Sequence, residues 1–132
     1  MADTAITSRE SKANNVDLIL FDYSNAAITT GTAKKEWIVP FIGVILDVIC
    51  DSETAGSGGT SDLIDVNING TTIYTTQGNR PTLLVGDTGL FSEAAEPEVT
   101  TVFPGDIVSY DIDQIATTGS ARFKISILLG MR

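Results

Sequence analysis

Four aspartates lie on segments with the pattern of β-strands and could together hold a hard cation. Asp111 and Asp113 are two residues apart, and Asp62 and Asp65 lie near the start of another such segment. Calcium prefers several oxygen ligands, and carboxylates supply them in many proteins. However, the chain has no EF-hand pattern, and half-exposed strands often carry outward Asp. Both interpretations stay open from these residues, and our prediction is a solvated strand face with no metal.

The composition gives little support for catalysis. The chain has no histidine, which removes the usual general base, the usual zinc ligand and any Ser–His or Cys–His pair. Cys50 is the only cysteine, so neither an intramolecular disulfide nor a thiolate metal cage can form, and its apolar neighbours predict a small buried side chain. The triplet at residues 87–89 (DTG) matches an aspartic-protease triplet without its surrounding pattern. We predict a protein with no catalytic residues and no cofactor.

The elements that must position these residues have the two-residue period of β-strands. Ile64, Val66 and Ile68 alternate with polar residues, and Asn69-Gly70 follows as a strong hairpin signal. Short segments of similar character recur at residues 17–22, 34–39, 41–50, 71–76, 80–85, 98–103, 106–113 and 122–129. Turn signals between many short strands are typical of a sandwich or barrel. The prediction is an all-β fold, an antiparallel jelly-roll sandwich of about eight strands.

Some segments carry more specific expectations. Residues 51–61 and 86–97 should be exposed loops, because they are rich in Gly and polar residues or lack a period. Trp37 should join the core. Segment 41–50 should be a central strand with one face made of Ile42, Val44, Leu46, Val48 and Cys50.

The charge is strongly asymmetric along the chain. The formal net charge is −9, and the two acids and two bases of residues 1–16 cancel, so the excess belongs to residues 17–132. A surface this negative repels phosphate backbones, so we expect no direct nucleic-acid partner. Residues 1–16 have no hydrophobic period and predict a flexible N-terminal arm, leaving residues 17–132 as the domain.

Membrane and secretion signals are not recognisable. The N-terminal residues lack the apolar segment of a signal peptide. The longest apolar stretch, residues 37–50, is interrupted by Pro40, Gly43 and Asp47 and is too short to span a bilayer as a helix. We expect a soluble protein, made in a cytoplasm, with no membrane partner.

A small set of residues is predicted to lie at an interface. Arg80 stands between a turn and Pro81, where it could pair with a nearby acid or with an acidic patch on a neighbouring molecule. Leu90 and Phe91 are apolar residues on a predicted loop tip, which is typical of an interface. Arg9 and Lys12 of the arm complete this predicted set.

Sequence elements in a particular order resemble a jelly-roll module of tailed-bacteriophage structural proteins. The elements are residues 37–40 (WIVP) leading into 42–45 (IGVI), 65–74 (DVNINGTTIY), 79–82 (NRPT), and 104–106 (PGD) followed by 111–114 (DIDQ). Each element alone is a turn or strand signature, and their order gives the resemblance its specificity. The resemblance extends over roughly residues 34–129, nearly the whole predicted domain.

The resemblance implies a non-enzymatic virion protein, and such modules commonly form trimers. A single domain with a short arm and no stalk favours a capsid decoration (cement) protein on the capsid surface. Its expected partners are the major capsid protein and itself as a homotrimer, and the arm would extend across neighbouring subunits by strand addition. The alternative is a receptor- or carbohydrate-binding tip of a phage fibre or baseplate.

Overall fold

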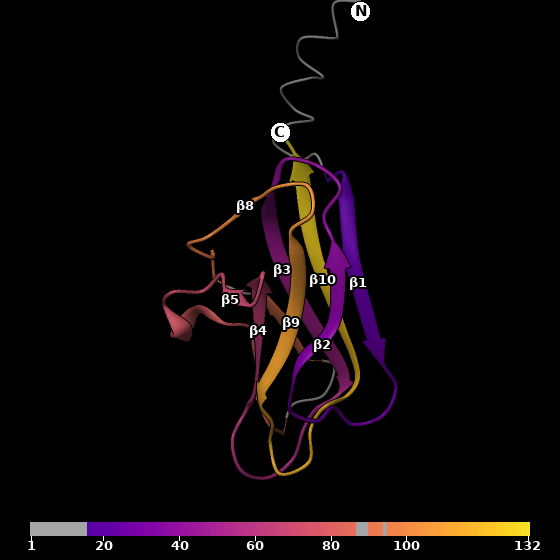
Figure 1. The fold of residues 1–132 in the computed structure, drawn as a ribbon. Helices are drawn as coiled ribbons and strands as arrows, with labels where there is room; N and C mark the ends of the chain where they lie inside the picture. The colour runs from indigo at the N-terminus through magenta and orange to yellow at the C-terminus, as the bar shows by residue number, and fades with distance from the viewer. Residues whose placement is uncertain (1–15, 87–89, 94) are drawn as a thin grey trace, which may run out of the picture.

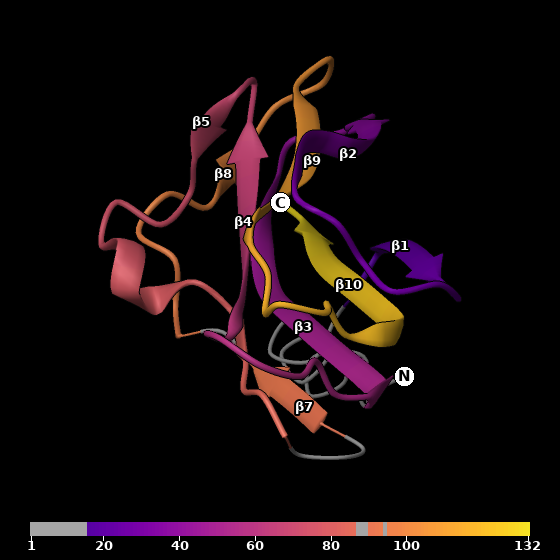
Figure 2. The ribbon, with the colours of Figure 1, turned by 90° about the horizontal axis from the view of Figure 1, so that it is seen from below.

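The computed structural model describes residues 16–86, 90–93 and 95–132, and gives the backbone alone at residues 90–93 (Figure 1). Arg9 and Lys12 of the predicted arm lie outside these ranges. Within them, the chain forms two antiparallel sheets packed face to face, seen end-on in Figure 2. No helix in the described ranges is long and apolar enough to cross a membrane.

The first sheet is built from the two ends of the chain and its middle. Its order is β1 (Leu18–Ser24), β10 (Ala121–Met131), β3 (Gly43–Thr54) and β7 (Leu90–Glu93), and β8 (Thr101–Val102) also pairs with β3. The second sheet has the order β2 (Gly31–Ile38), β9 (Ile107–Gln114), β4 (Asp62–Ile68) and β5 (Thr71–Thr72), and β6 (Thr82–Leu83) also pairs with β4. A short 3₁₀ turn, η1 (Gln77–Asn79), precedes β6.

The long strands alternate between the two sheets along the chain. β1 and β3 lie in the first sheet, β2 and β4 in the second, and β9 and β10 return to the middle of the second and first sheets respectively (Figure 1). This arrangement is the strand order of a jelly roll, in which each sheet has one strand from each end of the chain beside one from its middle. The predicted fold class is confirmed.

The core lies between the sheets and is filled by the inward side chains of the central strands. The predicted inward residues of β9 and β10 are all buried, namely Val108, Tyr110, Ile112, Phe123, Ile125, Ile127 and Leu129. Cys50 is fully buried among them, as expected. Burial raises the pKa of the Cys50 thiol far above its usual range, which keeps the thiol protonated and unreactive.

The predicted face of β3 is wrong over half of its length, because the strand carries a bulge. Asp47 pairs with Leu128 of β10 while Ile45 pairs with the next residue, Leu129, so Leu46 is an extra residue without a partner. One inserted residue moves the following side chains to the other face. Val48 and Cys50 therefore point inward as predicted, whereas Leu46 is exposed and Ile45 takes the core position.

Both predicted loops contain strand. Residues 51–54 continue β3, where Ser52 is buried opposite Phe123. Residues 90–93 form β7 and pair with β3, so Leu90 and Phe91 lie in a strand rather than at a loop tip. Pairing with a neighbouring strand outweighed a local composition typical of loops. Conversely, the predicted strands at 71–76, 80–85 and 98–103 retain only the two residues of β5, β6 and β8 each.

Candidate functional site

The outward side chains of β4 and β9 form a polar face on the second sheet. Asp65 lies opposite Asp111 and Asn67 opposite Ser109 in the register of these strands. Asp65, Asn67 and Ser109 are each only 5% exposed, although they point away from the core. The sequence pattern correctly placed polar residues on this side of β4. The predicted solvated face is wrong for Asp65, which is buried, whereas Asp113 is exposed as predicted and Asp111 is half-buried.

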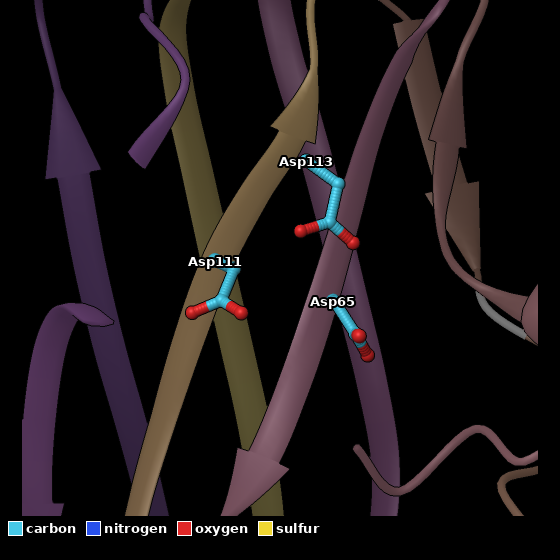
Figure 3. Close-up of side chains that lie close together, drawn as sticks. All are labelled: Asp65, Asp111 and Asp113. Carbon is cyan, nitrogen blue, oxygen red and sulfur yellow. The ribbon is translucent and has the colours of Figure 1, made fainter. Parts of the chain in front are cut away.

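Three of the four candidate aspartates lie together on this polar face. One carboxylate oxygen each from Asp65, Asp111 and Asp113 lies within 4.8 Å of the others (Figure 3). Two of these residues come from β9 and the third from β4 beside it, so the antiparallel pairing of the two strands creates the cluster. Such oxygens are suitable ligands for a hard cation.

Hydrogen bonds already occupy much of this acidic cluster. The two carboxylate oxygens of Asp111 accept from the backbone amide of Ala33 at 2.8 Å and from the Asn67 amide nitrogen at 2.9 Å. Oδ1 of Asp65 accepts from the Thr72 hydroxyl at 2.7 Å and from the amide of Val66 at 2.8 Å. These carboxylates therefore connect β2, β4, β5 and β9 as acceptors, whether or not a cation binds.

Arg80 supplies a positive charge to the same cluster. Its guanidinium binds Asp113 at 2.7 Å, and its Nε donates to the backbone carbonyl of Gln77 at 2.8 Å. Of the two roles open from the sequence, the structure shows the pairing with a nearby acid, which ties the turn at η1 to β9. Three carboxylates with one guanidinium leave the cluster net negative.

The burial and the charges of the cluster change the pKa of Asp65. Burial raises the pKa of the Asp65 carboxyl above its usual range, and the negative charge of Asp113 adds to this effect. The Thr72 and Val66 hydrogen bonds and the charge of Arg80 oppose the increase in pKa without cancelling it. The cluster thus carries one carboxylate whose ionised form is disfavoured in the folded protein.

Asp62 does not join the cluster and has a separate structural role. It is 1% exposed, and its carboxylate accepts from the backbone amides of Ala116 at 2.8 Å and Ser120 at 3.0 Å, and from the Ser120 hydroxyl. The Ser120 hydroxyl in turn accepts from the amide of Gly56 at 3.2 Å. Asp62 therefore fixes the connection between β9 and β10 against the start of β4.

A shallow hollow of about 340 Å³ lies beside the cluster on the polar face. Its lining includes Thr32, Glu36, Asn67, Asn69 and Asp111. Asn69 is already engaged, because it accepts from the amide of Ile107 at 2.9 Å and donates to Asp106 at 3.0 Å. Glu36 is exposed at the hollow, so a polar ligand would meet at least one acidic side chain there.

Some of the motif segments quoted in the sequence analysis bond to one another at the polar face, whereas residues 43–45 of the IGVI segment belong to β3 in the first sheet. The segment 65–74 is bonded to the other elements through Asn69–Asp106 and Asn67–Asp111, and the NRPT segment joins the DIDQ segment through Arg80–Asp113. The WIVP segment contributes Trp37, which is half-buried, packs against the core and stacks on Tyr110 with ring centroids 6.3 Å apart. These motif residues thus make contacts that hold the fold together.

The first sheet presents a different kind of surface, which sequence reasoning missed. On β1, Ile19, Phe21 and Tyr23 point away from the core and are 57%, 49% and 45% exposed. β10 and β3 continue the surface, where Leu128 lies between Ile19 and Asp47, and Ser126 lies between Phe21 and Ile49. Asp47 therefore places one acidic side chain on an otherwise largely apolar surface. We call this surface the apolar face, made of Ile19, Phe21, Tyr23, Leu46, Ile49 and Leu128. The alternation of large apolar residues in 19–23 was a signal for it, because the neighbouring Leu18 and Leu20 already supply the inward side.

Leu90, Phe91, Arg9 and Lys12 remain predicted interface residues. Leu90 and Phe91 are described only by their backbone, and Arg9 and Lys12 lie outside the described residues.

Comparisons with protein-family models and with curated proteins found no match to this chain.

Proposed function

We propose that the protein is a non-enzymatic virion structural protein, a capsid decoration protein that binds the major capsid protein of the assembled phage head as a homotrimer. In this proposal it is made in the host cytoplasm and resides on the capsid surface. The observation that carries the proposal is the direct bonding of the motif segments 65–74 and 79–82 to the segments 104–106 and 111–114. Residues far apart in the sequence, such as Asn69 and Asp106 or Arg80 and Asp113, bind one another directly, so the resemblance concerns a connected architecture rather than independent turns.

Three properties of the chain support an assembling role. The jelly-roll strand order is common in viral capsid domains and lectins, although fold alone does not determine function. The apolar face exposes Ile19, Phe21 and Tyr23 side by side on β1, and exposed apolar groups of this kind often mark an interaction site. A net charge of −9 also suits a protein that stays dispersed until it meets its partner.

Binding to assembled shells tests the proposal. Purified protein is mixed with phage heads that lack it, and in parallel with unassembled major capsid protein, and each mixture is sedimented. The proposal expects saturable co-sedimentation with heads and a raised temperature of head disruption, because a ligand specific for the assembled state stabilises that state. Absence of binding to heads at saturating protein would contradict it.

The hollow on the polar face favours one alternative, a receptor- or carbohydrate-binding tip of a phage fibre or baseplate. Its lining combines amide, hydroxyl and carboxylate groups, which are the usual partners of sugar hydroxyls. Saturable binding of a glycan that is lost in Glu36→Ala, with co-sedimentation to tails rather than heads, would support this alternative.

A further inference from the structure

We infer that the shallow hollow on the polar face binds a primary ammonium group carried on a flexible alkyl stem, as a lysine side chain presents it. The inference concerns the free protein and depends neither on a virion role nor on the oligomeric state. It rests on a buried hydroxyl without a partner at the floor of the hollow, on the acceptors beside it, and on the charge and volume of the lining.

The floor of the hollow contains the Ser109 side chain. Ser109 is only 5% exposed, and it lies in β9 between the inward residues Val108 and Tyr110, so its side chain points outward into the hollow. Its hydroxyl forms no hydrogen bond with any other described residue, although the large majority of buried polar side chains in folded proteins have a partner. The hydroxyl is therefore free to bond to a ligand.

Two further acceptors flank the Ser109 hydroxyl. Ser109 lies opposite Glu36 of β2 on one side and opposite Asn67 of β4 on the other. Neighbouring strands are about 4.8 Å apart, so the three residues form one row roughly 10 Å long across the face. The Asn67 amide nitrogen donates to Asp111, but among the described residues neither the Asn67 side-chain oxygen nor the Glu36 carboxylate has a partner. Three free oxygens in one row suit an ammonium group, which has three donors and no acceptor.

A bulge in β2 forms one wall of the hollow. Residues 32–34 all face the single residue Asp111 of β9, because the pairing of β2 passes from Gly31 directly to Lys35. Inserted residues of this kind bend a strand locally. The backbone amide of Ala33 donates to Asp111 at 2.8 Å and holds the bulge against β9. The hollow is thus bounded by fixed backbone on one side and by the β4 hairpin on the other.

The lining is acidic and, among the described residues, contains no cationic side chain. Glu36 and Asp111 supply its two carboxylates. The guanidinium of Arg80 is paired within the acidic cluster, and the ammonium group of Lys34 donates to a threonine hydroxyl outside the hollow at 3.2 Å. Lys35 faces the opposite side of β2 from Glu36. A cationic ligand is therefore attracted to the hollow, whereas an anionic ligand is repelled.

The volume and shape of the hollow favour an alkyl ammonium over a metal ion. The volume of about 340 Å³ equals that of roughly ten water molecules, far more than a single ion fills. Ile107, which is 38% exposed, lines the hollow two residues before Ser109 on β9, at a distance on the order of 7 Å. A four-carbon stem can lie along this apolar side chain while its charged head reaches the Ser109 hydroxyl.

Titrations followed by NMR test the inference. The isotope-labelled full chain is titrated at neutral pH and constant ionic strength with butylamine and with Nα-acetyl-lysine-N-methylamide, which carry the same charged head. Nα,Nε-diacetyl-lysine-N-methylamide keeps the stem without the charge and is the control ligand. Ser109→Ala removes the hydroxyl and Glu36→Gln removes the charge at the hollow. Glu53→Gln removes an equal charge from a side chain on β3 that is 55% exposed, and is the control variant.

We expect saturable shifts of the amide signals around the hollow with both amines, with a Kd on the order of millimolar for ligands of so few atoms, and none with the diacetyl compound. Ser109→Ala and Glu36→Gln should each weaken binding at least about threefold, and Glu53→Gln should leave it unchanged. Glu36 is exposed, so Glu36→Gln provides the test if Ser109→Ala fails to fold.

The comparison of the two amines distinguishes the sources of the ammonium group. Tighter binding of the lysine derivative than of butylamine would support the inference and assign the group to a lysine of a partner protein. Equal or weaker binding of the lysine derivative would support the inference and assign it to a free amine. Absence of saturable shifts at the hollow, equal binding of the diacetyl compound, or equal weakening by Glu53→Gln would overturn the inference.

Discussion

Removal of the Asp62 carboxylate should destabilise the fold more than removal of any exposed acid. Asp62 is 1% exposed and accepts hydrogen bonds from the amides of Ala116 and Ser120 and from the Ser120 hydroxyl. In Asp62→Ala these donors lose their acceptor inside the protein. A buried donor left unsatisfied costs about 1–3 kcal/mol, and the hydroxyl can turn toward another acceptor. The expected loss in free energy of unfolding is about 3–5 kcal/mol, a large part of the total of a small domain.

Asp62→Asn separates the hydrogen bonds from the simple loss of volume. One oxygen remains for the amide of Ala116, while the new NH₂ group faces the amide of Ser120, donor against donor. We expect a smaller loss of about 2 kcal/mol. In the double variant Asp62→Asn with Ser120→Ala, the loss in free energy of unfolding should differ strongly from the sum of the two single losses, because the two side chains share one hydrogen-bond network.

Urea unfolding, monitored by Trp37 fluorescence and circular dichroism, measures these differences in the free energy of unfolding. The comparison requires that the slope m, the change of this free energy with urea concentration, is the same in all variants. Glu53→Ala removes an equal charge from a side chain that is 55% exposed and serves as the control, with an expected change below about 0.5 kcal/mol. A loss below about 1 kcal/mol for Asp62→Ala would refute the role assigned to Asp62.

Other substitutions test the polar face and the turns. Arg80→Ala should lower the free energy of unfolding in urea by about 1–2 kcal/mol, because it leaves the acidic cluster without its cation. Arg122→Ala, at a side chain that is 56% exposed, should lower it by less than about 0.5 kcal/mol. Equal losses in the two variants would contradict the role of Arg80. Gly70 has φ +81° in the hairpin turn, so Gly70→Ala should cost about 1 kcal/mol by the same measurement, while Gly78→Ala, with ordinary φ and open space around it, should be nearly neutral. Because the folded pKa of Asp65 is raised, its ionisation reduces stability as pH rises through that pKa. Unfolding measured from acid to neutral pH should therefore show Asp65→Asn gaining stability relative to the unaltered chain as pH rises, and a relative loss would count against the raised pKa.

Much of the fold could be predicted because period and turn signals are local. The alternation in β4, β9 and β10 identified their inward residues correctly, and Asn69-Gly70 forms the expected turn with φ of +52° and +81°. The jelly-roll class, though not the order of the strands, was predicted from the number of short strands together with the resemblance. The failures required tertiary information. No local sequence pattern indicates the bulge at Leu46. Residues 90–93 form a strand because they pair with β3, which is distant in the sequence.

The candidate sites also combine features that are readable from the sequence with features that need the tertiary structure. The aspartates were identified from their strand positions, but only the register of β4 against β9 shows that Asp65 joins Asp111 while Asp62 turns to a different loop. The apolar face was missed because its residues lie on three strands that are distant in the sequence. Spacing within β1 shows apolar residues on both sides, yet only the packing of the two sheets shows that the described residues leave its outward side exposed.

The proposed role as a capsid decoration protein is tested most directly by cryo-electron microscopy of phage particles that contain the chain. The proposal predicts jelly-roll density fitted by this two-sheet fold on the outer surface of the head, at three-fold or quasi-three-fold positions, that disappears from particles made without the protein. Density for the fold found only at the tail or fibre tip would contradict it.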